Sequence, residues 1–181
     1  HLLSLINDVL EFSKIEADRA VLNLEDFDLH RLLFDIEEVF RLKVQEKGLS
    51  LAFVFETDVP QNIHADQSKL RQILINLLGN AVKFTQNGRI TLCVKNMGLV
   101  KETPTNECLL HFEVADTGVG IAPEEQEQIF DAFFQSDRQR SCQEGTGLGL
   151  SISQRFAEMM GSVLKVNSEA GKGTTFSFDV R

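Results

Sequence analysis

The sequence lacks the features that mark several classes of protein. It has no tryptophan and no tyrosine, and only three prolines and three cysteines in 181 residues. The odd cysteine count, with no CxxC pair and no cysteine–histidine cluster, argues against a disulfide framework or a zinc site. No stretch of 18 apolar residues exists, and no basic region precedes the apolar N-terminus. We therefore expect neither a transmembrane helix nor a secretory signal.

Positive charge is also scarce. Lysine and arginine total 18 against 27 acidic residues, which gives a formal net charge of −9. No basic stripe is visible, so we expect no nucleic-acid partner. Residues 61–120 carry 5 acidic and 6 basic side chains. An anionic ligand would therefore be repelled least in this middle third of the chain.

What the sequence does contain is typical of a globular domain with a core. Hydrophobic residues make up 43% of the chain, and 14 of them are phenylalanine. Cys93 and Cys108 lie in alternating apolar segments, so we expect them to fill the core as reduced thiols. Cys142 lies in a polar segment and is expected to be a surface thiol.

Hydrophobic periodicity and capping residues predict the elements. We expect a helix over residues 1–17, a second one of about twenty residues that Asp28 caps and Gly48 ends, and a third that Asp66 caps and that runs to about Phe84. Pro123 opens a short acidic helix, and a last helix ends near Met160. The predicted strands are 20–27, 51–55, 89–96, 108–115, 162–168 and 174–180. Adjacent strands favour antiparallel hairpins, so the fold class is α+β: a two-layer sandwich whose mixed, mostly antiparallel sheet packs on three helices.

The helix at 67–84 carries an unusual polar side. Asn76, Asn80 and Lys83 fall within a sector of roughly 60° on a helical wheel. Asparagine is a poor helix former, so two of them one turn apart need a reason. A carboxamide oxygen can bind Mg²⁺, and the lysine adds positive charge next to it. The alternative is an ordinary solvated polar face.

A carboxylate extends the apolar face of the strand that begins at Cys108. By the two-residue period Leu110, Phe112, Val114 and Asp116 share that face. A buried carboxylate is costly unless a donor binds it, and the amino group of adenine is such a donor. Gly118 and Gly120 would let the backbone pass close to a flat ring. The alternative is an ordinary D-x-G turn.

The third motif is GTGLG at residues 145–149, directly before a helix. Glycines let backbone amides approach phosphates, and the helix N-terminus adds partial positive charge. No GK[ST] follows, and no strand precedes the motif, so it is neither a Walker A loop nor a dinucleotide fingerprint. The preceding residues 135–144 are polar or small, and we expect a mobile lid there.

Taken in this order, the asparagine helix, the strand with DxGxG, FxxFF, GTGLG and a closing GKGT turn resemble the ATP-binding catalytic domain of sensor histidine kinases. That domain belongs to the same superfamily as gyrase, Hsp90 and MutL, whose members have the Bergerat-type ATP-binding fold. The resemblance covers about residues 20–181, and residues 1–17 resemble the end of the second dimerisation helix. It therefore implies two domains, residues 1–17 and residues 18–181.

The resemblance implies roles for individual residues. Asp116 would read adenine, Asn80 would bind Mg²⁺, Lys83 would contact the phosphates of ATP, and Asn76 would complete the catalytic set. The full nucleotide-binding set that it implies is Asn80, Lys83, Phe84, Asp116, Gly118, Gly120, Ile121, Phe130, Phe133, Gly145, Thr146, Gly147, Leu148, Gly149 and Thr174. The chain departs from the pattern at Gln135, where many relatives carry arginine, so Arg138 or Arg140 is a substitute.

The resemblance also separates transfer from hydrolysis. Hydrolysing members carry a glutamate one turn before the metal-binding asparagine, whereas this chain has Asn76, and a carboxamide cannot accept a proton from water. None of the four histidines, His1, His30, His64 and His111, stands in the sequence context of the family's phosphoacceptor. We therefore expect a piece of a cytoplasmic, homodimeric histidine kinase of a two-component system, cut from its phosphoacceptor domain. A response regulator receiver domain would be the further partner.

Three alternatives stay open: a module that senses ATP without transferring phosphate, a serine kinase or ATPase of the same superfamily, and a pure interaction domain.

Overall fold

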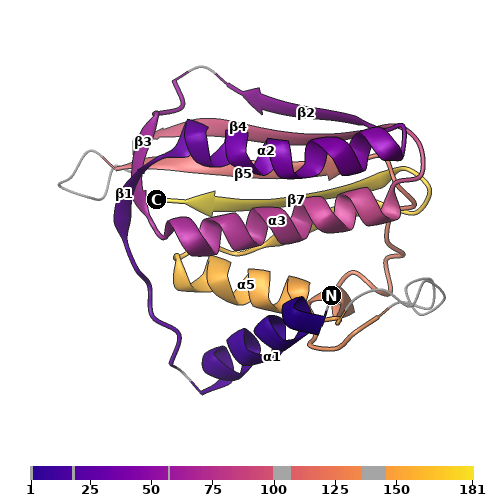
Figure 1. Ribbon diagram of the computed structural model, residues 1–181, viewed down its shortest axis with the longest axis horizontal. Coiled ribbons are helices and arrows are strands. Elements are labelled where there is room, and N and C mark those ends of the chain that lie inside the picture. The colour runs from indigo at the N-terminus through magenta and orange to yellow at the C-terminus, as the bar shows by residue number, and fades with distance from the viewer. Residues whose placement is uncertain (1, 18, 57, 100–106, 136–145) are drawn as a thin grey trace.

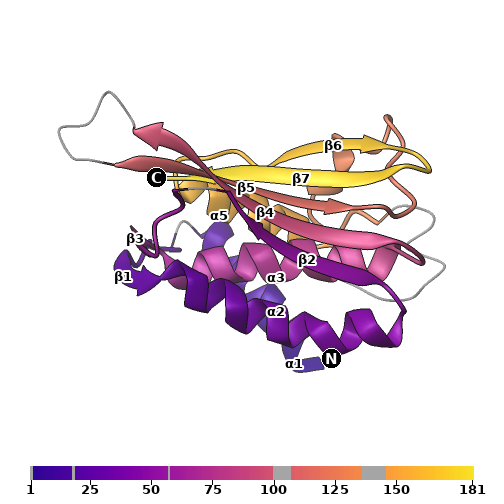
Figure 2. The ribbon, with the colours of Figure 1, turned by 90° about the horizontal axis from the view of Figure 1, so that it is seen from above.

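The computed structural model describes residues 2–17, 19–56, 58–99, 107–135 and 146–181. A five-stranded sheet forms one layer, and helices cover one of its faces (Figures 1 and 2). The strand order is β2-β4-β5-β7-β6, in which β2 and β4 are parallel and the other neighbours antiparallel. The predicted α+β sandwich with a mixed, mostly antiparallel sheet is therefore confirmed.

The elements follow one another as two layers and a small ribbon. The helices are α1 (Leu2–Glu16), α2 (Leu29–Glu46), α3 (Gln67–Phe84) and α5 (Gly149–Met159), with a 3-10 turn η1 (Gln128–Phe130). The sheet strands are β2 (Ser50–Phe55), β4 (Arg89–Leu99), β5 (Cys108–Asp116), β6 (Lys165–Glu169) and β7 (Gly173–Val180). Strands β1 (Glu25–Asp28) and β3 (Asn62–Ala65) pair separately as an antiparallel ribbon. Helix α1 packs outside the sandwich, against α5 (Figure 1).

The predicted helix caps are confirmed. The Asp28 carboxylate accepts the Arg31 backbone N–H at 2.8 Å and starts α2. The Asp66 carboxylate accepts the Lys69 backbone N–H at 3.0 Å and starts α3. Gly48, just after α2, has a φ of +66°, the left-handed conformation that ends a helix at low cost. These local signals set the lengths of the two long helices.

The core lies between the helical layer and the sheet. Each of α2 and α3 turns one apolar side inward, and β5 alternates buried and half-buried residues along its length. Phe112 of β5 stacks on Phe178 of β7, with ring centroids 5.2 Å apart. The β5–β7 register then places Asp116 opposite Thr174, at the end of both strands. Core packing thereby delivers a carboxylate to the edge of the apolar layer.

Some predicted elements were wrong in extent. Residues 20–24 are an extended segment without strand pairing, and β1 begins only at Glu25. Strand β3 was missed, because its four residues become a strand only by pairing with β1. The acidic segment after Pro123 forms turns and the short η1 in place of a regular helix. Strand β4 continues to Leu99, and β6 begins three residues later than predicted.

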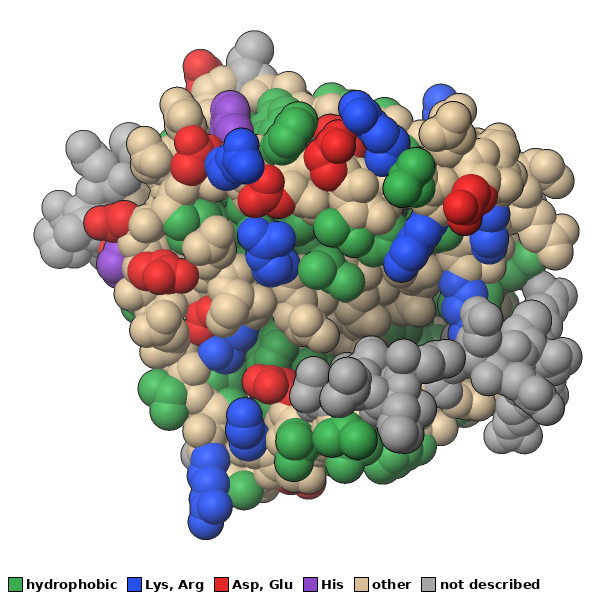
Figure 3. Space-filling view, viewed as in Figure 1, with side chains coloured by type: hydrophobic (Ala, Val, Ile, Leu, Met, Phe, Trp, Pro, Cys, Tyr) green, Lys and Arg blue, Asp and Glu red, His purple; other side chains and the backbone are tan. Residues whose placement is uncertain are grey.

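Two further observations concern the surface. In the described part of the chain, none of the helices combines the length and apolarity needed to cross a bilayer. The exposed side of the helical layer mixes positive, negative and hydrophobic side chains (Figure 3). Cys93 and Cys108 are half-buried and free, whereas Cys142 lies outside the described residues.

Candidate nucleotide-binding site

The polar side of α3 faces away from the core, as its sequence predicts. Leu70, Ile73 and Leu77 are fully buried, whereas Asn76, Asn80 and Lys83 are half-buried. The three polar residues therefore lie on one side of a rigid, well-packed helix. Half-burial leaves their side chains able to meet a ligand while the backbone beneath them is held in place.

Asn76 has a defined partner in α5. Its Nδ2 donates to the Ser153 hydroxyl at 2.8 Å, and Ser153 is completely buried. The same side chain lies against Gly149, where an added Cβ would stand 2.8 Å from Asn76 Cγ. Asn76 therefore holds the first turn of α5 beside α3, a contact that sequence reasoning missed because the partners are 77 residues apart.

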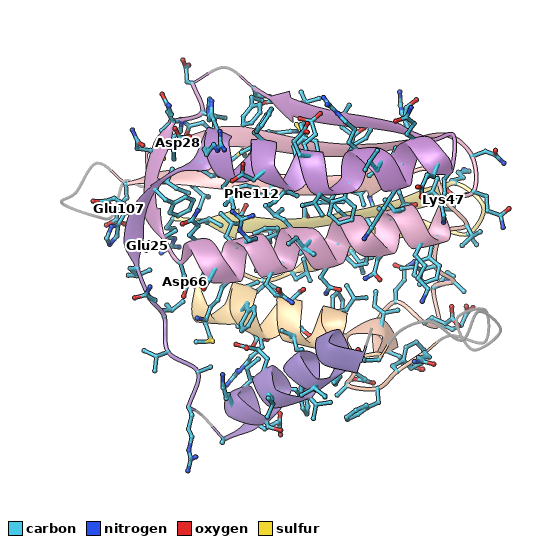
Figure 4. All side chains as sticks on the ribbon, in the orientation of Figure 1. Glu25, Asp28, Lys47, Asp66, Glu107 and Phe112 are labelled. Atoms are coloured by element: carbon cyan, nitrogen blue, oxygen red, sulfur yellow. The ribbon has the colours of Figure 1, made fainter. Side chains whose placement is uncertain are left out.

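The C-terminal end of α3 carries a concentration of positive charge. The Lys83 ammonium lies 5.0 Å from the centroid of the Phe84 ring, within the range of a cation–π contact. Lys47, which follows α2, donates its ammonium to the carbonyl of Val82 at 2.7 Å and to that of Lys83 at 3.3 Å (Figure 4). Lys47 thus offsets the partial negative charge of the last helical carbonyls. Nothing near Lys47 in the sequence indicates this role.

Asp116 is the most distinctive acid of the site. Its Oδ1 accepts the Gly118 backbone N–H at 2.8 Å. Burial raises the pKa of Asp116 above its usual range, while the N–H groups of Gly118 and Thr174 lower it in part. A carboxylate that is desolvated in this way is stabilised by a further donor, such as the amino group of a base.

The loop after Asp116 requires glycine for steric reasons. A Cβ at Gly118 would stand 2.6 Å from the carbonyl oxygen of Phe84 and 2.7 Å from Asp116 Oδ1. Gly120 has a φ of +66° and lies against the backbone of Glu169. The chain therefore passes between the end of α3 and the β6–β7 turn, where no side chain fits.

Ser168 organises that passage. Its hydroxyl accepts the Ile121 backbone N–H at 2.8 Å, donates to the Gly173 carbonyl at 2.9 Å and lies 2.9 Å from Thr174 Oγ1. Gln126 donates to the carbonyls of Ile121 and Ser168 at 3.1 and 2.9 Å. Sequence reasoning missed both residues, since neither belongs to a glycine motif. They fix Ile121 and Thr174, two predicted site residues, next to Asp116.

The described part of the GTGLG motif forms the start of α5. Gly147 has a φ of +72° and a Cβ there would stand 2.8 Å from the carbonyl carbon of Phe133. Thr146 Oγ1 accepts the Leu148 backbone N–H at 3.1 Å. The Leu148 side chain is fully buried, so only its backbone is available to a ligand. Gly145, Arg138, Arg140 and most of the predicted lid lie outside the described residues.

The two predicted phenylalanine anchors behave differently. Phe130 is half-buried, and its ring lies edge-on to Phe176 at 6.4 Å between centroids. Phe133 is 63% exposed and has a φ of +65°, and its backbone N–H donates to the Gly147 carbonyl at 3.0 Å. Its ring lies edge-on to Phe12 of α1 at 5.9 Å. Phe133 therefore connects Gly147 of the GTGLG motif to α1, whereas Phe130 packs against the core.

A metal at this site would need ligands other than clustered acids. Among the residues that the structure describes, no group of three histidine, cysteine or acidic side chains could hold an ion. The Asn80 carboxamide beside Lys83 suits a hard cation whose other ligands are phosphate oxygens and water. The donor set therefore fits Mg²⁺ that arrives with a nucleotide.

The geometry defines a class of protein: an α/β sandwich in which the polar side of α3, the glycine loop after Asp116 and the start of α5 carry the candidate ligand-binding groups. A family model described as "Histidine kinase-, DNA gyrase B-, and HSP90-like ATPase" matches residues 65–181. The chain belongs to this family. The prediction of an ATP-binding domain of the histidine kinase type is thus confirmed.

Individual relatives are histidine kinases. The chain is 41% identical over 99% of its length to "Hybrid signal transduction histidine kinase B" of Dictyostelium discoideum and 38% identical over 99% to the histidine-protein kinase BarA of Escherichia coli. It covers 9% and 19% of those proteins, respectively.

Solved structures give the same picture. Full-length ShkA in complex with AMPPNP has a TM-score of 0.84 and 39% identity, over 99% of this chain and 35% of that one. Histidine kinase ThkA, solved in complex with the response regulator protein TrrA, has a TM-score of 0.75 at 24% identity, over 99% and 47% of the two chains; it shows the shared fold.

We expect Gly149→Ala to damage the site. The new Cβ would collide with the Asn76 carboxamide, which must turn away and lose its hydrogen bond to Ser153 or displace α5, so we expect a loss of about 1–3 kcal/mol of stability, together with weaker ATP binding. Gly79→Ala is the matched control, because no atom lies within 4 Å of a Cβ there and the residue is helical. That variant should gain about 0.5–1 kcal/mol. Urea unfolding and calorimetric titration measure both effects; a Gly149→Ala protein as stable as wild type would contradict the packing argument.

Proposed function

We propose that this chain binds Mg·ATP and transfers its γ-phosphoryl group to a histidine on a dimerisation domain, as part of two-component signal transduction. The single observation that carries the proposal is the largely desolvated Asp116 carboxylate, which accepts the Gly118 N–H beside a passage where no side chain fits. The family membership supports the ATP-binding half, and the names of the relatives support the transfer half.

Adenine recognition follows from the chemistry of Asp116. Its carboxylate accepts hydrogen bonds only, and one of its oxygens already accepts the Gly118 N–H. The adenine amino group would supply a donor to this carboxylate. Guanine would present a carbonyl in the same place, which an ionised carboxylate repels. Phe84 and Ile121 are the apolar neighbours proposed to line the base.

The phosphates would lie at the start of α5. Gly147 and Gly149 lie there. The first N–H groups of a helix have no intrahelical partner, and the helix dipole favours negative charge at that end. Lys83 would contact a phosphate, and Asn80 would hold Mg²⁺. That ion would neutralise charge on the β- and γ-phosphates during transfer.

Transfer is favoured over hydrolysis by what surrounds Asn76. Its Nδ2 already donates to Ser153, and a carboxamide has no basic group to activate water. The chain thus offers phosphate binding without a water-activating base at that position. We propose that the acceptor is a histidine outside these 181 residues.

Helix α1 suits the end of a dimerisation helix. Ile15 is buried and Phe12 half-buried on the side that packs against the domain, whereas Ile6, Val9 and Leu10 are 46%, 48% and 54% exposed. Hydrophobic side chains gather at the lower edge of the helical face, where α1 lies (Figure 3). We propose that residues 1–17 continue a helical dimerisation domain, that residues 18–181 form the catalytic domain, and that the whole kinase is cytoplasmic and passes phosphate to a response regulator.

Calorimetry with ATP and GTP tests the proposed function. We expect ATP with Mg²⁺ to bind and to raise the unfolding temperature. GTP should bind more weakly by about 1–3 kcal/mol, roughly 5- to 150-fold, because the guanine carbonyl faces the Asp116 carboxylate. Equal stabilisation by the two nucleotides would overturn the adenine assignment, and binding of neither would overturn the nucleotide site.

A further inference from the structure

The segment between α1 and β1 is held only in part by apolar side chains. It runs over residues 19–24 along one side of the helical layer (Figure 1). Ala20 packs against the core and Leu22 is half-buried, whereas Val21 is 76% and Leu24 54% exposed. Two hydrogen bonds of its backbone hold it as well: the Asn23 N–H donates to Asp66 Oδ2 at 2.8 Å, and the Val21 carbonyl accepts from Lys69 Nζ at 2.8 Å.

The two oxygens of the Asp66 carboxylate have different hydrogen-bond partners. Its Oδ1 caps α3, accepting from the Lys69 backbone N–H at 3.0 Å and the Ser68 hydroxyl at 2.7 Å. Its Oδ2 faces the segment and accepts from the Asn23 N–H at 2.8 Å and from the Lys69 ammonium at 2.7 Å. The helix cap therefore needs only Oδ1, and asparagine would serve equally well as a cap. Oδ2 takes no part in the cap and instead accepts hydrogen bonds from the segment and from Lys69.

The ion pair is well shielded from water. Asp66 is 1% exposed and the Lys69 side chain 11% exposed. Burial alone would raise the pKa of Asp66, but the hydrogen bonds from Asn23, Lys69 and Ser68 lower it to about 2. The Asp66 carboxyl group is therefore ionised at neutral pH, and a charge-assisted hydrogen bond shielded from water is stronger than an exposed ion pair.

The same ammonium reaches α5. Lys69 Nζ lies 5.5 Å from the centroid of the Phe156 ring, which is almost fully buried. Phe156 belongs to the helix whose first turn holds Gly149 and whose Ser153 accepts from Asn76. One ion pair thus joins the segment, the start of α3 and the helix that would bind phosphate (Figure 4).

We propose that Asp66 and Lys69 are positioning residues, which fix the segment at residues 21–23 and thereby set where α1 meets the nucleotide site. The proposal rests on the proposed function, since it concerns the placement of a phosphoacceptor domain. Releasing the segment would leave the ATP site intact, because no group of the segment lies among its residues. It would instead widen the range of positions that α1 can take relative to Gly147, and so slow transfer.

Asp66→Asn tests the proposal on the 181-residue chain. Its Oδ1 still caps α3, while an NH₂ group replaces the acceptor of the Asn23 N–H. We expect amide hydrogen exchange at Asn23 to be at least about tenfold faster, and ATP affinity to stay within about twofold of wild type. Ser68→Ala is the matched control: it removes a partner of Oδ1 only, and Asn23 should exchange as in wild type. Unchanged amide exchange at Asn23 in Asp66→Asn would contradict the proposal that Asp66 holds the segment.

The transfer step needs the chain extended upstream with complete dimerisation helices. There, Asp66→Asn should lower kcat for autophosphorylation at least about tenfold with an unchanged KM for ATP, because placement and not binding is lost. Asn23→Pro, which lacks the N–H and leaves the ion pair intact, should reproduce the loss, whereas Ser68→Ala should not. A wild-type kcat in both Asp66→Asn and Asn23→Pro would overturn the positioning role. An extended wild-type chain that bound no ATP would contradict the proposed function instead.

Discussion

Asp116→Asn should abolish most ATP-induced stabilisation and, in the absence of nucleotide, raise the unfolding temperature. The loss follows because a carboxamide NH₂ would face the adenine amino group, placing donor against donor at a cost of about 1–3 kcal/mol or more. The gain follows because burial raises the pKa of Asp116, so the folded protein holds a desolvated charge at neutral pH.

The pH dependence of the extra stability of Asp116→Asn without nucleotide gives an independent check. A group whose folded pKa lies above its unfolded value destabilises the fold once it ionises, so the wild type loses stability as pH rises from 3.8 through the folded pKa. The advantage of Asp116→Asn should therefore be full above the folded pKa and vanish below 3.8. Scanning calorimetry from pH 3 to 8 measures it. Asp131→Asn, at an exposed site, is the control, and an equal shift in both variants would refute the explanation.

With Mg·ATP alone, the 181-residue chain should neither label itself on histidine nor hydrolyse ATP at a useful rate. Asn76 offers no base to water, and none of the four histidines stands in an acceptor context. Supplying complete dimerisation helices joined at residues 1–17 should restore transfer. The residues that we propose to surround the γ-phosphate, Asn80, Lys83 and the start of α5, all belong to this chain.

In the extended chain, Asn80→Asp should abolish or strongly reduce transfer, because a carboxylate changes both the metal ligand and the charge next to the phosphates. Asn87→Asp makes the same chemical change at an exposed turn and should be neutral. The measurement uses radiolabelled ATP and tests whether the label on the protein survives acid and base. Acid-labile, base-stable label on the short chain would refute the missing-acceptor proposal, and acid-stable label would indicate a serine kinase.

The predicted site residues fall into two groups when compared with the structure. Asp116, Gly118, Gly120, Ile121 and Thr174 gather at one end of β5 and β7, and Gly147 and Gly149 gather at the start of α5. Asn76 lies on the predicted polar side of α3, and there its Nδ2 donates to the Ser153 hydroxyl at the interface of α3 and α5. A wheel places residues on a side of a helix but does not show which neighbour lies there.

Features that depend on local chemistry can be predicted from the amino-acid pattern alone. The Asp28 and Asp66 caps, the apolar faces of α2 and α3, and the placement of Asp116 on the buried face of β5 follow from period and side-chain type, since each depends on residues within a few positions.

The contacts that join these parts arise only when the chain is folded. Lys47 binds the end of α3 from 35 residues away, Asn23 binds Asp66 across 43, Ile121 binds Ser168 across 47, and Asn76 binds Ser153 across 77. Residues 20–24 alternate as a strand would, yet none of the strands in the described part of the chain pairs with them, and two hydrogen bonds to the Asp66–Lys69 pair help to hold them. Pairing and hydrogen bonding depend on which groups the packed core brings within 3 Å, and no local pattern encodes that distance.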